Sequence, residues 1–247
     1  HTLQIADGLW LDKKFKAAMM KSIAQSELDR KRFVYSDIGC ILLQQVVEAV
    51  TGKTLDAYLV SEFYRPMGLE HTLFQPLNRY KKADIMPTAA NDYLRRQDLC
   101  GYVHDEAAAF MGGVSGNAGL FSTAQELGKI YQMILNEGEL DGKRYLRPET
   151  CRIFTTEKSA VSHRGLGYDK PNLKDPKANA CASSAPASVY GHTGFTGTCA
   201  WVDPENDLVY IFLSNRLCPD AWNGKLNSMK IRQAVQEVIY QSLYTPE

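Results

Sequence analysis

The sequence lacks the features that would indicate a nucleic-acid partner, a membrane-spanning segment or an export signal. Its 28 lysines and arginines are balanced by 28 aspartates and glutamates, so no net field favours nucleic acid or an anionic membrane. No apolar run approaches the roughly 20 residues that cross a bilayer. The first residues contain neither an initiator methionine nor a signal-peptide pattern, as in a processed product, a designed chain or a fragment.

Metal-binding patterns are also missing. The six cysteines form no C-x-x-C pair, and none of the five histidines, including His71 and His163, stands at ligand spacing with them. We therefore expect no metal site, and no other cofactor is indicated. Cys40 and Cys199 lie inside apolar runs and are expected to be buried thiols.

The composition is that of an ordinary globular protein, with 45% hydrophobic and 23% charged residues in 247. Helical spacing of apolar residues predicts a helix from Ile38 to a stop at Gly52, another after Ser122 and a third near the C-terminus. Two β-rich runs on either side of residues 203–207 predict an antiparallel hairpin. We predict a single α/β (α+β) domain over residues 1–247, an antiparallel sheet flanked by helices.

Residues 72–121 show little periodicity and are predicted to form a functional loop or lid. The glycines between Gly112 and Gly119 match neither G-x-G-x-x-G nor G-x-x-x-x-G-K-[ST], so a tight packed turn explains them better than a phosphate cradle. The cluster His104-Asp105-Glu106 could carry acid–base or metal chemistry, but such a cluster is more often a polar loop.

Tyr35-Ser36-Asp37 stands at the entrance of the first strongly apolar helix. The commoner interpretation is a helix cap by Ser36 or Asp37, with Tyr35 packing beside it. The functional interpretation makes the Tyr35 hydroxyl a proton acceptor, which requires nearby cations to stabilise a phenolate whose pKa is ordinarily near ~10.

The second candidate is the stretch Gly-His-Thr-Gly-Phe-Thr-Gly at residues 191–197, which leads into the predicted hairpin. Glycines beside His192 and Thr193 indicate a strand edge that a ligand or another backbone approaches closely. The alternative is a strand whose polar side chains simply face solvent.

Together these two stretches resemble the serine β-lactamase and penicillin-binding-protein superfamily, in particular its class C β-lactamase-like, esterase-type branch. Its members carry S-x-x-K, Y-x-N, and K-T-G or H-T-G motifs. Tyr35-Ser36-Asp37 matches the second motif with aspartate in place of asparagine, and His192-Thr193-Gly194 matches the third. The resemblance covers residues 33–243. The run 103–106 followed by Gly112-Gly113 is similar to serine-hydrolase domains fused to family 3 glycoside hydrolases.

The S-x-x-K motif is absent from the sequence, because no serine is followed by lysine three positions later. In the family this motif precedes the tyrosine by more than the 34 residues present here. The resemblance therefore implies a C-terminal portion whose nucleophilic serine lies upstream, or a diverged member that has no nucleophile.

For the complete protein, the resemblance implies acyl transfer through a serine ester. Tyr35, His192 and Phe195 are the predicted catalytic residues: Tyr35 moves the proton, and the Phe195 backbone N–H forms half of the oxyanion hole. Asp37, Thr193 and Gly194 are the predicted substrate-binding residues. These assignments derive from the family motifs.

The resemblance also implies a substrate class. Because histidine replaces lysine at position 192, a fixed charge for a substrate carboxylate is lost near pH 7, which favours an esterase or a peptidoglycan-directed hydrolase over a β-lactamase. The expected partners are a small ester, a β-lactam or a peptidoglycan-derived substrate, and a fused glycoside hydrolase domain upstream. The expected location is the periplasm or cell envelope. The alternative is an inactive module that binds cell-wall fragments or supports a fused glycosidase.

Overall fold

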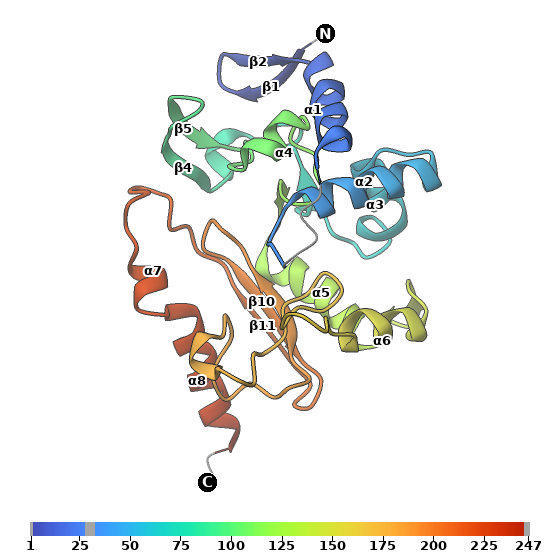
Figure 1. Cartoon of the computed structure of the whole chain (residues 1–247), viewed down its shortest axis with the longest axis vertical. Coiled ribbons are helices and arrows are strands. Elements are labelled where there is room, and N and C mark those ends of the chain that lie inside the picture. The colour runs from blue at the N-terminus through green and yellow to red at the C-terminus, as the bar shows by residue number, and fades with distance from the viewer. Residues whose placement is uncertain (1, 28–32, 245–247) are drawn as a thin grey trace. The chain divides into compact units, whose positions relative to one another are not determined.

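A computed structural model of the chain describes residues 2–27 and 33–244 (Figure 1). Contacts between Cα atoms divide the chain into two compact units. Unit 1 comprises His1–Thr123 and Leu217–Ala221, and unit 2 comprises Ala124–Arg216 and Trp222–Glu247. Mixed helices and antiparallel strands make up both, as predicted.

Unit 1 is built from short strand pairs and helices. Its elements are β1 (Thr2–Ala6), β2 (Leu9–Asp12), α1 (Lys14–Gln25), α2 (Ile38–Thr51), α3 (Leu55–Leu59), a π-helical turn (Val60–Tyr64), β3 (Leu73–Phe74), two 3-10 turns (Pro76–Asn78 and Lys82–Asp84), β4 (Pro87–Asp92), β5 (Gln97–Cys100), α4 (Glu106–Phe110) and β6 (Leu120–Phe121). The strands pair antiparallel as β1–β2, β3–β6 and β4–β5. One small apolar core joins Ile5 of β1 to Val103, Ala108 and Ala109 around α4.

Helix α2 forms where the sequence predicts it and ends at Gly52, which adopts a left-handed φ of 66°. Its buried face carries Ile41 and Gln44, whereas Leu43 and Val46 are exposed. Cys40 is also exposed, so the prediction of a buried thiol is wrong at this position. An apolar stretch on a helix shows that one face is apolar but does not show which residues another element covers.

The stretch 72–121 differs from the predicted loop, since it contains β3 to β6 and α4. These elements are two to six residues long, too short to produce a readable period in the sequence. The β4–β5 hairpin also has two non-glycine residues at positive φ, Asn91 at an irregularity of β4 and Arg96 in the turn. Such turns depend on their tertiary surroundings more than on residue type.

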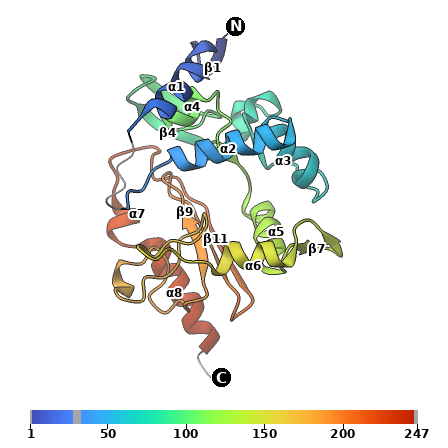
Figure 2. The ribbon, with the colours of Figure 1, turned by 45° about the vertical axis from the view of Figure 1, so that its right-hand side comes forward.

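Unit 2 is organised on a three-stranded antiparallel sheet (Figures 1 and 2). Its elements are α5 (Ala124–Leu135), β7 (Glu139–Leu140), β8 (Lys143–Arg144), α6 (Pro148–Thr156), a 3-10 turn (Pro176–Ala178), β9 (Tyr190–Thr193), β10 (Cys199–Asp203), β11 (Leu208–Phe212), α7 (Lys225–Ser228) and α8 (Ile231–Tyr244). The strand order is β11-β10-β9, and β10 and β11 form the predicted hairpin around residues 203–207.

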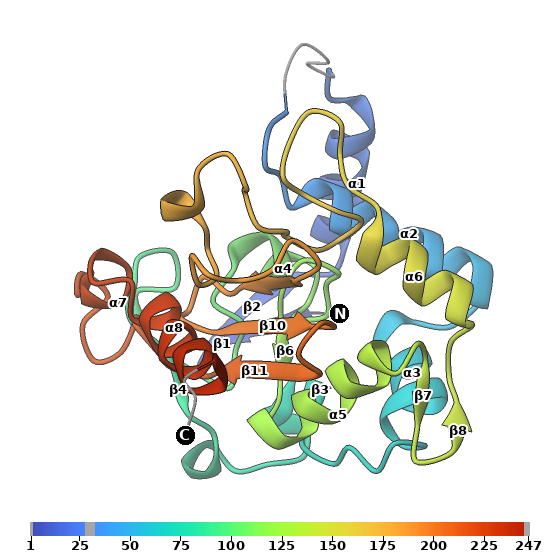
Figure 3. The ribbon, with the colours of Figure 1, turned by 90° about the horizontal axis from the view of Figure 1, so that it is seen from below.

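Helices cover both faces of this sheet, and Figure 3 shows α8 and α5 on either side of β11. On one face, Trp201 and Tyr210 are buried with Tyr240 of α8, whose hydroxyl donates to Oδ2 of Asp203 at 2.8 Å. On the other face, Ile211 of β11 packs towards α5. Alternate residues of each strand therefore enter two apolar layers, and this fixes the register of the sheet.

Candidate active site

His192, Thr193 and Gly194 lie on and just after β9, at the edge of the three-stranded sheet in the described part of the chain. His192 is opposite Ala200 and Thr193 is opposite Cys199 on β10. Because successive side chains on a strand point to opposite faces, His192 and Thr193 lie on different sides of the sheet. Cys199 is buried, as the sequence predicted.

A segment running from Arg164 to Asp169 continues outward from this edge. The N–H of Asp169 donates to the Gly191 oxygen at 2.7 Å, and the N–H of Gly191 donates to the Asp169 oxygen at 3.1 Å. Glycine is required at position 191, since a Cβ there would overlap the Ala200 carbonyl oxygen and lie 2.7 Å from Cε3 of Trp201. This pairing brings the Arg164 side chain next to His192.

Nη1 of Arg164 lies 2.9 Å from Nε2 of His192, and Nδ1 of His192 lies 2.7 Å from the Thr193 carbonyl oxygen. A guanidinium has donors only, so Nε2 must accept, and Nδ1 must carry the proton that it donates to the carbonyl. These partners favour the tautomer of His192 that carries its proton on Nδ1. Both ring nitrogens are therefore held by the protein itself.

Asp169 anchors the arginine. Its Oδ1 forms an ion pair with Nη1 of Arg164 at 2.8 Å, and its Oδ2 lies 3.9 Å from Nε2 of His192. His163 lies 3.6 Å from the same carboxylate, although its sequence context indicated no partner. The Asp169 side chain is 6% exposed and that of Arg164 is 24% exposed. Of the Arg164–Asp169 ion pair, the guanidinium is therefore the more exposed member.

Phe195 lies in the turn between β9 and β10, and its ring is exposed. The turn is closed by the Gly197 N–H, which donates to the Gly194 oxygen at 3.1 Å, and by the Gly194 N–H, which donates to the Thr198 oxygen at 2.7 Å. A Cβ at Gly194 would overlap Oγ1 of Thr198, and Gly197 has a φ of +119°. The glycines of the motif thus permit a turn too tight for other residues.

Tyr35 and Asp37 belong to unit 1, and the other four predicted site residues belong to unit 2. The Tyr35 side chain is 58% exposed. Asp37 is the N-cap residue of α2 and its side chain makes no capping bond, so the predicted side-chain cap is not formed. Oγ of Ser36 accepts from the Ile38 N–H at 3.3 Å. These contacts leave the proposed chemical roles of Tyr35 and Asp37 as predictions.

The other two sequence candidates have structural roles. Asp105 caps α4 by accepting from the Ala108 N–H at 2.7 Å, and it also accepts from Nδ2 of Asn117 at 3.0 Å. Within the glycine-rich segment, the Gly116 N–H donates to Oε1 of Gln44 at 3.1 Å. The segment is therefore a turn packed on α2, which agrees with the interpretation preferred from its spacing.

Sequence reasoning missed Arg164, the residue that completes the charged cluster beside His192. It lies 28 residues before its partner, in a loop without periodicity. The only signal nearby is the Arg-Gly-Leu-Gly-Tyr-Asp run at 164–169, whose glycines mark a bent backbone but no charge pairing.

Comparisons with a sequence-family model and with curated proteins indicate the family of this chain. The sequence model described as Beta-lactamase matches residues 1–232. A protein of Escherichia coli named "Putative D-alanyl-D-alanine carboxypeptidase" is 36% identical over 217 residues, which cover 83% of this chain and 50% of that protein. A protein of the same name from Salmonella gallinarum is 32% identical over 227 residues, which cover 86% of this chain and 52% of that protein. The chain spans about half the length of these curated relatives.

Solved structures show the same fold. The hydrolase EstCE1, described as having promiscuous acyltransferase activity, matches with a TM-score of 0.60 at 18% identity, covering 94% of this chain and 64% of its own. An octameric penicillin-binding-protein homologue from Pyrococcus abyssi matches with a TM-score of 0.58 at 18% identity, covering 94% and 52%. Among the described residues, no helix combines the length and apolarity that crossing a membrane would require.

Proposed function

The chain belongs to the Beta-lactamase family, and on that premise we propose that it is part of a serine acyl hydrolase directed at peptidoglycan peptides. The proposed reaction is removal of the terminal D-alanine from a peptide ending in D-alanyl-D-alanine. Two relatives that are at least 32% identical to this chain are named for this activity. The nucleophilic serine would lie outside residues 1–247, since no S-x-x-K occurs among them.

The reaction has two halves. The serine oxygen attacks the carbonyl carbon while its proton passes to the base, and the carbonyl oxygen becomes an oxyanion. Collapse of this intermediate breaks the C–N bond, and the departing amine takes up the proton. Water then attacks the acyl ester in the same manner and releases the acid and the serine.

His192 would hold the Arg164 guanidinium, and the other five predicted site residues have proposed roles in these steps. Tyr35, together with a lysine outside the chain, would move the proton between the serine and the leaving amine. The Phe195 N–H would donate to the oxyanion. Asp37, Thr193 and Gly194 would line the substrate, with Thr193 donating its hydroxyl to a substrate oxygen.

The observation that carries the proposal is the cation next to the H-T-G motif. Arg164 contacts His192 at 2.9 Å, and Asp169 holds it from the buried side. A hydrogen bond from a guanidinium to a carboxylate is charge-assisted and stronger than one between neutral groups. Histidine in place of lysine at position 192 removes a fixed positive charge, and Arg164 supplies one in its place. This charge favours a substrate with a free C-terminal carboxylate over a simple ester.

A peptidoglycan substrate implies a place in the cell envelope, and we propose that location for the complete protein. The fused glycoside hydrolase predicted from the resemblance remains a prediction, because the relatives that support the family carry no such name.

Acyl-enzyme formation tests the proposal. The complete gene product is incubated with a fluorescent penicillin, and covalent labelling is followed on a denaturing gel and by intact mass. We expect one label per chain, at a serine outside residues 1–247. Labelling of residues 1–247 expressed alone would show that the nucleophile lies within them and would overturn this assignment.

The absence of S-x-x-K favours a second candidate, a non-catalytic module that binds cell-wall fragments or supports a fused glycosidase. It predicts that the complete gene product binds muropeptides in calorimetry and neither cleaves them nor reacts with the penicillin.

A further inference from the structure

Arg232, near the start of α8, contacts the turn that follows β9. Its Nη1 donates to the carbonyl oxygens of Gly194 at 3.3 Å and Thr198 at 2.9 Å, and its Nη2 donates to Oδ1 of Asn227 at 3.0 Å. A planar guanidinium can hold two carbonyls in fixed positions, which the flexible ammonium of lysine does less well. Both ends of the turn are therefore tied to one cation.

A second arginine holds the middle of the same turn. Nε of Arg216 donates to the Phe195 oxygen at 2.6 Å, and the Arg216 backbone N–H donates to the Thr196 oxygen at 2.8 Å. The Arg216 guanidinium also lies 4.2 Å from the centre of the Phe195 ring. The Gly197 oxygen accepts from Oγ of Ser214 at 2.7 Å. Each carbonyl from residue 194 to residue 198 therefore accepts a hydrogen bond within unit 2.

These contacts fix the direction of the Phe195 N–H. In a planar trans peptide the C=O and N–H groups point in opposite directions. The Gly194 oxygen points towards Arg232, so the Phe195 N–H of the same peptide points away from Arg232. A cation on the oxygen also polarises the peptide, and hydrogen bonds in such a chain strengthen one another.

We propose that Arg232 is a positioning residue of the oxyanion hole, which acts through the Gly194–Phe195 peptide by orienting and polarising its N–H. Arg216 supports the same turn from the next peptide. The inference rests on the proposed function, because it assigns the N–H of Phe195 to the developing negative charge. A donor that is oriented before the reaction costs no reorganisation when the charge appears.

Kinetics of the complete gene product test this role. Arg232→Gln is expected to lower kcat by about 10- to 100-fold, less than the ~10²–10³-fold loss that follows removal of an oxyanion donor itself. KM is expected to change little, because the N–H contributes mainly in the transition state. Arg232→Lys, which keeps the charge, is expected to have a kcat between those of the wild type and Arg232→Gln.

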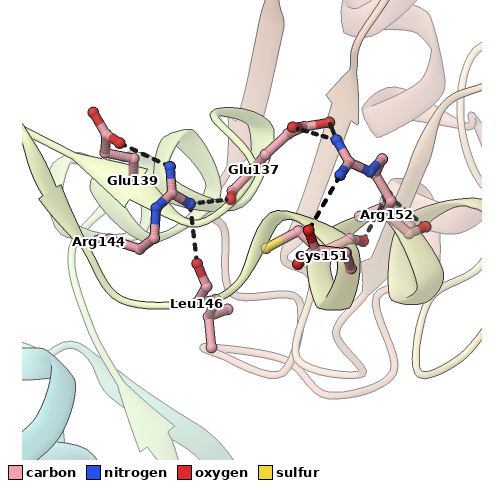
Figure 4. Close-up of polar contacts among 8 residues, drawn as sticks. Glu137, Glu139, Arg144, Leu146, Cys151 and Arg152 are labelled. Atoms are coloured by element: carbon pink, nitrogen blue, oxygen red, sulfur yellow. Dashed lines mark hydrogen bonds and ion pairs between the residues drawn. The ribbon is translucent and has the colours of Figure 1, made fainter.

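The matched control is Arg144→Gln. Nη1 of Arg144 also bridges two backbone carbonyls, those of Glu137 at 2.9 Å and Leu146 at 3.1 Å, on the β7–β8 hairpin (Figure 4). We expect Arg144→Gln to lower the melting temperature and leave kcat unchanged. Equal kcat losses for the two variants would overturn the proposal, since they would show a general effect of stability.

A boronic acid inhibitor separates positioning from folding. Its tetrahedral adduct places an oxygen in the oxyanion hole, so its affinity follows transition-state binding. In Arg232→Gln, the inhibition constant is expected to rise by the same factor by which kcat/KM falls. An unchanged inhibition constant beside a lowered kcat/KM would contradict the proposed role.

A spectroscopic measurement needs no activity. With ¹⁵N-phenylalanine incorporated at the nine phenylalanines, the Phe195 amide is assigned by its disappearance in Phe195→Leu. We expect its proton signal to move upfield in Arg232→Gln and to stay in place in Arg144→Gln. An unmoved signal would overturn the positioning role, whereas an inert wild-type enzyme would overturn the proposed function, so the two failures are distinct.

Discussion

Nη1 of Arg164 lies 2.9 Å from Nε2 of His192, and the same nitrogen pairs with Oδ1 of Asp169 at 2.8 Å. Arg164 thus lies between a buried carboxylate and the H-T-G histidine at the edge of the sheet. Because both nitrogens of the His192 ring are held, we propose that this ring positions the Arg164 guanidinium.

Arg164→Gln is expected to raise KM for a peptide with a free C-terminal carboxylate by about 10- to 100-fold, since a hydrogen bond to a charged group contributes about 1.5–3 kcal/mol. A p-nitrophenyl ester without a carboxylate is expected to keep its KM. Steady-state kinetics on both substrates measure the difference. Arg152→Gln is the control, because Arg152 pairs with Glu137 on the surface of the same unit (Figure 4). Equal KM changes on the two substrates would contradict carboxylate recognition.

Gly191→Ala is expected to destabilise unit 2. The new Cβ would overlap the Ala200 carbonyl and lie 2.8 Å from Cα of Trp201, so β9 and β10 would have to separate. Overpacking of this kind costs about 1–3 kcal/mol of stability. Each kcal/mol lowers the melting temperature by about 2–4 °C. Gly39→Ala is the control, since a Cβ at Gly39 meets nothing within 4 Å in α2. If calorimetry gave both variants the same melting temperature, the close contact of position 191 with β10 would not limit the stability of unit 2.

Stability is expected to fall as the pH rises from 9.0 to about 11. Burial raises the pKa of the Cys199 thiol from 9.0 to about 11, so the unfolded chain loses this proton before the folded chain does. The stabilisation is complete below pH 9.0 and disappears through the folded-state pKa, with a slope near 1.4 kcal/mol per pH unit for one group. Urea denaturation at several pH values measures the slope, which is expected to be shallower in Cys199→Ala. The same slope in both proteins would rule out Cys199 as its source.

Tyr35→Phe in the complete gene product is expected to lower kcat on p-nitrophenyl esters by about 10²–10⁴-fold, the contribution typical of a general acid–base group. Tyr93→Phe is the control, because Tyr93 is an exposed tyrosine on the β4–β5 turn of the same unit. Unchanged turnover in Tyr35→Phe would remove Tyr35 from the mechanism.

The sheet of unit 2 was predictable because its strands are long enough to show a pattern. The runs around residues 203–207 are β-rich, and the structure pairs Cys199 with Phe212 and Asp203 with Leu208 as the predicted hairpin requires. Helix α2 was predictable for the same reason, with a period of apolar residues and a terminal glycine at 52. Local patterns therefore recovered the hairpin of unit 2 and the first strongly apolar helix of unit 1.

Long-range contacts were not predictable. Arg164 joins His192 across 28 residues through a strand-like pairing of Asp169 with Gly191, and nothing in the local sequence specifies that pairing. Arg232 is similar, because a residue of an amphipathic helix gives no sign that its side chain reaches two carbonyls 34 and 38 positions earlier. Charge pairing of this kind depends on tertiary geometry.

The most direct test of the central claim is the release of D-alanine from diacetyl-L-lysyl-D-alanyl-D-alanine by the complete gene product, measured beside Arg164→Gln. We predict stoichiometric release of one D-alanine per peptide, and a strongly raised KM in the variant. Binding of the peptide with no release of D-alanine would contradict the hydrolase and support the non-catalytic module.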